Sequence, residues 1–306
     1  MSHGRQTSST GANTILFGGS GFFGTHILEN YPEIVSIGRT PPPTGNRHIQ
    51  VESLADLRAL RDLQFDRVIY LVGHSDNHGM DKDTLAPGEP SAFDHHLFPA
   101  LQVLEQLKQY RITKMIHFST VLLYDPTRLT LPVSETAPID PYRSRYLLSK
   151  HMSEEACRFY SRWIPIINVR ISNTYGPTRL KRYDLINTLI KQVLETGRGS
   201  VWSTKPYRDF IHVEDVAHAV VKLLGSSYTG TVNLATGTMT QVRTIVDLVQ
   251  ELSGCAIEDK DCEVTGPMRF QCDTSTLEGV IDWQPRFSIR EGVSQTYSVM
   301  KSWTAS

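Results

Sequence analysis

The sequence has few cysteines and no marked excess of charge of either sign. Its four cysteines form no C-x-x-C pair and have no histidines at zinc-finger spacing, so we expect neither a metal centre nor a disulfide framework. This usage fits a reducing, cytoplasmic compartment. The 31 basic and 32 acidic residues leave a net charge of −1, which excludes a global field that would attract nucleic acid or an anionic membrane. Any phosphate group must therefore be bound locally.

Long apolar runs are also missing. No segment reaches the roughly 18 consecutive apolar residues of a membrane-spanning helix, so we expect no membrane partner. Residues 1–12 are polar and rich in Ser, Thr and Gly, which predicts a flexible tail rather than a secretory signal. The remaining length is enough for a large core and predicts two lobes.

A glycine-rich turn near the N-terminus is the strongest signal that is present. The apolar run 14–17 ends in Gly18, Gly21 and Gly24, three residues apart, and then enters a helix-compatible segment. This pattern is typical of the first turn of a dinucleotide-binding βαβ unit. There, Gly18 permits the turn, Gly21 lets the backbone approach a pyrophosphate, and Gly24 lets the helix pack on its strand. An ordinary glycine turn is the alternative interpretation.

The end of the next predicted strand, at 34–37, indicates which dinucleotide is bound. An NAD-preferring unit carries an acidic residue there to hold the ribose 2′-hydroxyl, whereas this chain has Arg39. A guanidinium beside that ribose pairs with a 2′-phosphate, so the charge favours NADP over NAD. The alternative is that Arg39 only faces solvent.

Strands and helices alternate through the next hundred residues. The polar loop at 75–89 has no periodicity, and loops of this length are usually functional. Four side chains in this loop could bind a metal: Asp76, His78, Asp81 and Asp83. Because the carboxylates lack EF-hand spacing, we interpret these residues as solvated side chains. The expected elements are a strand at 49–51, a helix at 54–63, a strand at 68–72 that ends at Gly73, a helix at 93–110 and a strand at 115–118.

A Y-x-x-x-K motif provides candidate residues for acid/base catalysis. On a helix, the spacing of Tyr146 and Lys150 places the phenol and the ammonium on one face, one turn apart. A nearby lysine favours the phenolate, so the tyrosine can exchange protons with a substrate hydroxyl. Ser119 and Thr120 end the strand before this helix, and open α/β sheets carry their chemistry outside the carboxyl ends of strands. Alone, the motif is more often an exposed helix pair.

Together these residues resemble the extended short-chain dehydrogenase/reductase family, in the branch that acts on nucleotide-activated sugars. The resemblance runs nearly from end to end of the chain. The further segments that carry it are Phe118–Tyr124, Pro141–Lys150, Val169–Pro177, Arg208–Val216 and Asp282–Arg286.

The order of elements and the resemblance imply an α/β fold. We expect a Rossmann-type doubly wound parallel sheet with a smaller C-terminal substrate-binding lobe. In the family, the helices equivalent to those expected at 91–110 and 145–163 pair as a four-helix interface of a homodimer; ordinary packing is the alternative. The expected division is a tail at 1–12, an NAD(P)-binding domain at 13–172 and a substrate lobe at 173–306, from which about 207–235 returns to the first domain.

The resemblance also implies roles for individual residues. Thr120 would hydrogen-bond the substrate oxygen, Tyr146 would act as acid or base, and Lys150 would bind the nicotinamide ribose and tune the tyrosine. Asn173 and Arg208 would contact the sugar nucleotide, whose diphosphate suits the planar fork of an arginine, and Arg269 would add a second cation. The expected cofactor-binding residues are Gly18, Gly21, Phe22, Phe23, Gly24, Arg39, Val72, Gly73, Tyr146 and Lys150.

Departures from the family pattern reduce the number of reactions that the chain could catalyse. Val121 and Leu122 stand where 4,6-dehydratases carry Asp and Glu, and no cysteine lies between residues 74 and 156 to serve an epimerase-reductase. His96 replaces a usual asparagine near the cofactor. We therefore expect NADP-dependent reduction of a 4-keto nucleotide-diphosphate sugar. The alternatives are a 4-epimerase with tightly bound NAD and a non-catalytic NADP-binding relative, which usually loses the tyrosine or the lysine.

Overall fold

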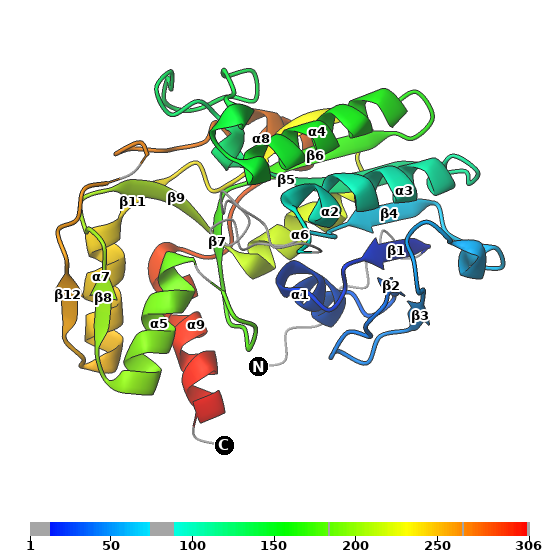
Figure 1. Ribbon diagram of the computed structural model, residues 1–306. Helices are drawn as coiled ribbons and strands as arrows, with labels where there is room; N and C mark the ends of the chain where they lie inside the picture. Colours follow the sequence, from blue (N-terminus) through cyan, green and yellow to red (C-terminus); the bar gives the residue numbers. More distant parts are fainter. Residues whose placement is uncertain (1–12, 74–88, 183, 265, 305–306) are drawn as a thin grey trace. The chain divides into compact units, whose positions relative to one another are not determined.

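The structure is a computed structural model that describes residues 13–73, 89–182, 184–264 and 266–304 (Figure 1). The predicted tail at 1–12 and nearly all of the predicted loop at 75–89 lie outside these ranges. The chain forms two compact units, each described here by itself. The first comprises residues 1–119, 144–169 and 217–231, and the second comprises residues 120–143, 170–216 and 232–306.

A seven-stranded sheet, in the order β10-β6-β5-β4-β1-β2-β3, confirms the predicted α/β class. The pairings of β3 with β2, β2 with β1, β1 with β4, and β4 with β5 are all parallel. Of the segment expected to return at 207–235, residues 217–231 belong to the first unit, and the domain bounds stay a prediction. The strands are β1 (Thr14–Phe17), β2 (Val35–Gly38), β3 (His48–Gln50), β4 (Arg67–Tyr70), β5 (Lys114–Thr120), β6 (Ile166–Ile171) and β10 (Gly230–Leu234).

The strand order reverses beside β1. The chain first moves from β1 to β2 and β3, and then returns to place β4 on the other side of β1. In open α/β sheets this reversal opens a crevice at the carboxyl ends of the two strands, where ligands bind. Gly18 directly follows β1, and Gly73 lies three residues after β4. The topology therefore brings two of the predicted cofactor residues to the switch point.

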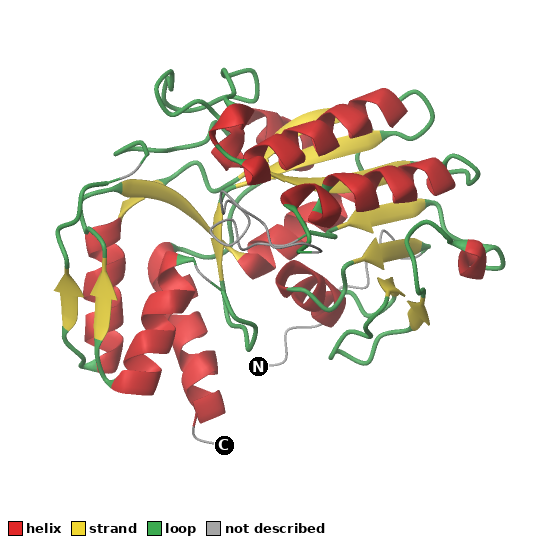
Figure 2. Ribbon diagram, viewed as in Figure 1, coloured by secondary structure: helices red, strands yellow, loops and turns green. Residues whose placement is uncertain are grey.

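Helices cover this part of the sheet on both faces. Because the sheet grows in opposite directions from the switch point, right-handed crossovers put α1 and α3 on opposite faces. Figure 2 shows α3 and α4 side by side on one face and α1 on the other. β1 is buried along its whole length, as expected for a strand covered twice. The helices are α1 (Phe22–Asn30), α2 (Ala92–His95), α3 (Leu97–Leu107), α4 (Arg145–Tyr160) and α6 (Val213–Leu224).

The helix predicted at 54–63 is wrong. Only a single 3₁₀ turn forms, at Arg58–Leu60. Side chains bond to the backbone ahead of it: the Ser53 hydroxyl accepts from the N–H of Ala55, and the Asp56 carboxylate accepts from the N–H of Arg58. Such local bonds compete with helical ones.

The helix predicted at 93–110 is interrupted. His96 has φ −120° and ψ −56°, which separates α2 from α3. Pro99 lies in the first turn of α3 and has no N–H to bond back to His95, so an uninterrupted helix would lose a hydrogen bond there. At this break His96 is buried in the interior of the first unit and is only 2% exposed.

In its described residues, the second unit contains the remaining sheets and the helices α5, α7, α8 and α9. β9 pairs in parallel with β7 and in antiparallel with β11, and β8 pairs in parallel with β12. α5, α7 and α9 enclose a core that includes Ile190, Val246 and Val293. The elements are β7 (Asn173–Tyr175), α5 (Leu185–Thr196), β8 (Gly199–Val201), β9 (Tyr207–His212), β11 (Met239–Gln241), α7 (Val242–Ser253), β12 (Ile257–Asp259), α8 (Ser275–Ile281) and α9 (Ile289–Thr304). Within the described ranges, none of the helices is long and apolar enough to span a membrane.

A buried carboxylate ties the strands of the second unit together. Asp209 is fully buried, and one of its oxygens accepts from the N–H and the hydroxyl of Thr236 at 2.9 and 2.7 Å. The other accepts from the N–H groups of Gly237 and Cys272 at 3.0 and 3.3 Å. Burial raises the pKa of Asp209, while these bonds act to lower it. The carboxylate thus joins β9 to two segments that are distant in sequence.

We expect Asp209→Asn to destabilise the protein by about 2–4 kcal/mol. The new amide group would turn a donor toward backbone N–H groups that now donate to the carboxylate, so buried donors would lose their acceptor. Denaturant unfolding measures the change. Asp247→Asn, at an exposed position of α7, is the matched control and should stay within about 0.5 kcal/mol of the parent. Equal stability of the two variants would contradict the structural role of Asp209.

Candidate functional site

The glycine turn after β1 has the geometry of a backbone cradle. Gly18 has φ +90°, which favours glycine. A Cβ atom on Gly24 would overlap the carbonyl oxygen of Gly18 and lie 2.7 Å from the Cα of Gly19, so α1 packs on the turn only without a side chain. Among the described residues, a Cβ on Gly21 would meet only the Gly18 oxygen, at 3.4 Å. The fold therefore explains Gly18 and Gly24, whereas the space beside Gly21 is available to a ligand.

The N-terminus of α1 lies at this space. The helix starts at Phe22, and its N-cap is Gly21, which brings no side-chain acceptor to the first turn. Helix N-termini bind anions through backbone N–H groups and the helix dipole. The residues present thus fit a dinucleotide pyrophosphate.

Arg39 stands at the carboxyl end of β2, the strand next to β1. The residue is exposed, and within the described part of the chain no carboxylate pairs with it. The preference for NADP that the sequence predicts from Arg39 stays a prediction.

Gly73, His96 and Lys150 converge in the first unit. A Cβ atom on Gly73 would lie 2.8 Å from Cδ2 and 3.3 Å from Nε2 of His96, and 3.8 Å from Nζ of Lys150. The backbone after β4 therefore passes directly over both side chains. Because Gly73 is at the switch point, the lysine and the histidine are beside the place where the fold binds its ligand.

Tyr146 lies in the first turn of α4, against His96. The two rings meet edge to face, with centroids 5.3 Å apart and planes at 79°. The N-cap of α4 is Ser144, whose hydroxyl accepts from the N–H of Leu147 at 3.1 Å and fixes the start of the helix. The phenol is half-buried. Tyr146 and Lys150 thus share one side of α4, as the i, i+4 spacing predicts.

The proton on His96 can be assigned from its partners. Nδ1 is 2.9 Å from the carbonyl oxygen of Ala92 and 3.0 Å from the hydroxyl of Ser149. The Ser149 hydroxyl already donates to the carbonyl oxygen of Tyr146 at 2.8 Å, so it accepts from His96. Nδ1 therefore carries a proton and binds two acceptors. The sequence shows His96 only as a replacement for asparagine and does not reveal its contact with the tyrosine.

Lys150 bonds to the end of β5, and its pKa depends on burial and on a nearby carboxylate. Its ammonium donates to the carbonyl oxygen of Phe118 at 2.9 Å. Burial lowers the pKa of Lys150 to about 8, and the nearby Glu154 acts in the opposite direction. Glu154 lies one turn further along α4 and is 2% exposed. The lysine is therefore charged at neutral pH and loses its charge under mildly alkaline conditions.

His117 adds no charge to this group. Burial lowers the pKa of His117 to about 4, with a further contribution from Lys150. Its Nδ1 is 2.9 Å from the side-chain oxygen of Asn168. The ring is thus neutral at physiological pH, and Lys150 keeps the positive charge.

We expect Glu154→Gln to move the alkaline limb of the kcat/KM profile to lower pH. Lys150 is charged below its pKa of about 8; without the carboxylate, burial is less opposed, the pKa falls further, and the charge is lost sooner. Steady-state rates between pH 6 and 10 measure the limb, which reports on the free enzyme. Glu155→Gln is the matched control, because Glu155 is exposed and pairs with Arg158. An unchanged limb in Glu154→Gln would refute the coupling.

Thr120, the last residue of β5, belongs to the second unit. The side chain is 6% exposed, and its hydroxyl accepts from the N–H of Leu122 at 3.2 Å. This bond caps a 3₁₀ turn, Val121–Leu123, that ends the strand. The hydroxyl keeps its proton available as a donor.

The other three predicted substrate residues also lie in the second unit. Arg208 donates to the carbonyl oxygens of Tyr207 and Pro267 at 2.9 and 2.8 Å, and burial lowers its pKa. Arg269 bridges to Tyr207, and its guanidinium lies 5.2 Å from the centre of that ring. Both arginines thus contact Tyr207, Arg208 at its backbone oxygen and Arg269 at its ring. Asn173 donates to the carbonyl oxygen of Asp209 at 3.1 Å, from the neighbouring strand.

Metal ligands do not gather in the part of the chain that the structure describes: no three His, Cys, Asp or Glu side chains group there. The potential ligands Asp76, His78, Asp81 and Asp83 lie outside the described residues.

A family model for NAD-dependent epimerases and dehydratases matches residues 14–235, from β1 through the last strand of the large sheet. The chain belongs to this family. The match confirms the resemblance stated from the sequence and makes the protein an enzyme of the epimerase/dehydratase family, with a nicotinamide dinucleotide as cofactor.

The proteins that are similar to this chain are named for different activities. A Methanocaldococcus jannaschii protein provisionally named UDP-glucose 4-epimerase is 28% identical, covering 94% of this chain and 98% of its own length. GDP-L-fucose synthase 1 of Arabidopsis thaliana is 29% identical, covering 64% of this chain and 65% of its own length. RMD from Pseudomonas aeruginosa, solved with NADPH, has a TM-score of 0.78 at 21% identity and covers 95% of this chain and all of that one. The last comparison shows a shared fold.

Proposed function

We propose that the protein catalyses NADP-dependent reduction of the 4-keto group of a nucleotide-diphosphate sugar. The observation that carries this choice is Arg39, an exposed cation at the end of β2, where an NAD site needs a carboxylate. A guanidinium without a carboxylate partner matches the 2′-phosphate of NADP. The similarity to a GDP-L-fucose synthase supports a reductive reaction.

The cofactor would bind across the switch point. Gly18, Gly21, Phe22, Phe23 and Gly24 would hold the pyrophosphate at the start of α1. At the carboxyl end of β4, Val72 and Gly73 would line the nicotinamide half, and Lys150 would bind its ribose. NADPH supplies a hydride when bound there.

The chain's own residues would manage the proton. Tyr146 would donate it to the oxygen of the reduced carbonyl, and Thr120 would hydrogen-bond the same oxygen. Lys150, positively charged at neutral pH, would stabilise the tyrosinate that remains and lower the pKa of the phenol. His96 would keep the tyrosine ring in place through the edge-to-face contact.

The substrate diphosphate would lie on Arg208 and Arg269. Two guanidinium groups around Tyr207 supply the local positive charge that a chain of net charge −1 otherwise lacks. Asn173 would contact the sugar nucleotide next to them.

A second candidate is a 4-epimerase that retains NAD. It is favoured by the relative from M. jannaschii, which is similar to this chain over nearly the full length of both proteins. Such an enzyme oxidises and re-reduces the same carbon and regenerates its cofactor in each turnover. In that case Arg39 would be a surface charge.

We also propose that the enzyme is a cytoplasmic homodimer. Exposed apolar side chains gather on α3, α4 and the turn after α4: Phe98, Met152, Phe159 and Trp163 are between 41% and 51% exposed. A second copy would bury this face.

All four cysteines are free thiols, which supports a reducing compartment. Light scattering should then give about twice the chain mass of 34.5 kDa, and the mass of a monomer would contradict the dimer.

Whether the purified protein retains a cofactor distinguishes the reductase from the epimerase. A reductase must release its spent cofactor, so we expect no retained nicotinamide nucleotide and tighter binding of NADPH than of NADH. Absorbance of the released cofactor after denaturation, together with a binding titration, measures both. Tightly retained NAD would instead support the epimerase.

A further inference from the structure

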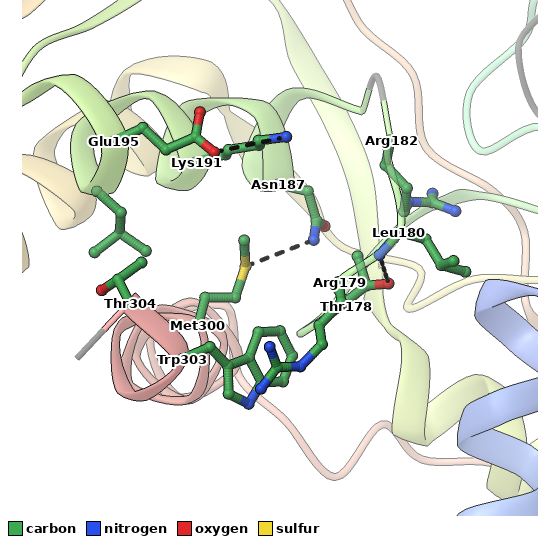
Figure 3. Close-up of a pocket in the computed structure, with 11 residues that line it drawn as sticks. Thr178, Arg179, Leu180, Arg182, Asn187, Lys191, Glu195, Met300, Trp303 and Thr304 are labelled. Atoms are coloured by element: carbon green, nitrogen blue, oxygen red, sulfur yellow. Dashed lines mark hydrogen bonds and ion pairs between the residues drawn. The ribbon is translucent and has the colours of Figure 1, made fainter. Parts of the chain in front are cut away.

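A pocket in the second unit lies outside the proposed catalytic and substrate residues. It has a volume of about 240 Å³ and is formed by the loop after β7, one face of α5 and the last turn of α9 (Figure 3). None of the residues expected from the sequence to bind cofactor or substrate lines it. Its apolar side chains are Leu180, Leu194, Met300 and Trp303.

Arg179 is the cation that this pocket holds in place. Its guanidinium lies over the indole of Trp303, 4.7 Å from the ring centre, and Figure 3 shows the two groups stacked. A guanidinium on an aromatic face keeps its N–H donors at its edge, where they can bind an oxyanion with two parallel hydrogen bonds. Among the described residues, no carboxylate pairs with Arg179. The charge is therefore available to a ligand.

The loop that carries Arg179 is fixed on both sides. Before it, the buried Asn187 of α5 donates to the carbonyl oxygen of Gly176 at 2.6 Å and accepts from its N–H at 3.3 Å. After it, Arg182 pairs with Asp184 at 2.6 Å and donates to the carbonyl oxygen of Thr174 at 3.2 Å. A ligand would thus meet an ordered arginine and would not lose affinity to ordering the loop.

A second cation lies across the pocket. Lys191 of α5 is 3.7 Å from Glu195 in an exposed i, i+4 pair. Such a pair contributes little to stability, so the lysine can turn to an anion at small cost. Arg182 and Glu195 also line the pocket, but Arg182 pairs with Asp184 and Glu195 with Lys191. Arg179, Lys191 and the apolar wall therefore define the chemistry of a ligand: an oxyanion attached to a small apolar body.

We propose that this pocket binds a small molecule with a phosphate or carboxylate group, at a site separate from catalysis. The oxyanion binds the edge of Arg179, Lys191 attracts it from across the pocket, and the apolar body packs on Leu194, Met300 and Trp303. The volume is below the roughly 300–1,000 Å³ of pockets for drug-sized ligands, so the body is about the size of one ring. The proposal does not depend on whether the enzyme is a reductase or an epimerase.

Trp303 provides the readout. Full-length protein with saturating NADP is titrated with phenyl phosphate, and with inorganic phosphate and phenol as its two halves, at constant ionic strength. We expect saturable quenching of tryptophan fluorescence by phenyl phosphate, with a dissociation constant at least tenfold below that of phosphate, and no saturation by phenol. The quenching should vanish in Trp303→Phe. Calorimetry on this variant should still detect phenyl phosphate binding, weakened less than tenfold.

Arg179→Met tests the contact itself. Calorimetry should show at least tenfold weaker binding of phenyl phosphate, because the bidentate contact is lost. Arg198→Met, at an exposed position of the same unit, is the matched control and should bind like the parent. Unchanged melting temperatures would show that both variants fold. Equal affinity of Arg179→Met and the parent, or no saturable binding of phenyl phosphate by the parent, would overturn the proposal.

Discussion

Replacing Tyr146 by phenylalanine is expected to lower kcat by about two to four orders of magnitude. The phenol is the proposed proton donor, and the change removes one oxygen while it keeps the ring against His96. The start of α4 should be unaffected, because Ser144 caps it through the N–H of Leu147. Single-turnover oxidation of NADPH with a 4-keto sugar nucleotide measures the step.

The affinity for the cofactor separates this effect from misfolding. Tyr146→Phe should bind NADPH within a few fold of the parent, since the pyrophosphate and the 2′-phosphate are held elsewhere. Tyr142→Phe is a matched control, because Tyr142 lies four residues earlier and its side chain is 83% exposed; its rate should be unchanged. Full activity of Tyr146→Phe would remove the tyrosine from the mechanism.

Replacing Arg39 by serine is expected to weaken NADPH binding by roughly tenfold to a hundredfold. A hydrogen bond to a charged partner is worth about 1.5–3 kcal/mol, and each 1.4 kcal/mol changes affinity tenfold. NADH carries a hydroxyl in place of the 2′-phosphate, so its affinity should change little. Fluorescence titration of the reduced cofactors gives both constants.

The nearby Arg47 supplies the control for Arg39. It is also exposed, and its backbone carbonyl accepts from the N–H of Ser36 in β2, so Arg47→Ser changes the same region and the same net charge. We expect Arg47→Ser to bind both cofactors like the parent. If Arg39→Ser weakens NADPH and NADH equally, Arg39 does not recognise the phosphate.

What the sequence predicted well depends on short spacings. The glycine turn and the pair of Tyr146 and Lys150 each span fewer than eight residues, so backbone geometry alone brings their atoms together. The alternation of strands and helices likewise predicted the parallel sheet. The helix predicted at 54–63 was wrong because Ser53 and Asp56 bond to the backbone locally.

The contacts that the sequence did not predict join distant residues. His96 bonds to Ser149, 53 residues away, and Asp209 bonds to Cys272, 63 residues away. The pocket around Arg179 needs Trp303 from the last helix. No local pattern encodes such pairs, because they arise only when the fold packs its elements. A buried acid one turn after Lys150 was visible as Glu154, but its effect on the lysine depends on burial.

The most direct test of the proposed reaction is cofactor consumption during turnover. Purified enzyme is incubated with NADPH and with 4-keto-6-deoxy sugars linked to UDP, dTDP, GDP or CDP, and separately with UDP-hexoses. We expect that one 4-keto sugar nucleotide is reduced and that one NADPH is oxidised per product formed. Interconversion of UDP-hexoses at C4 without net oxidation of added NADPH, together with no reduction of any 4-keto sugar nucleotide, would contradict it.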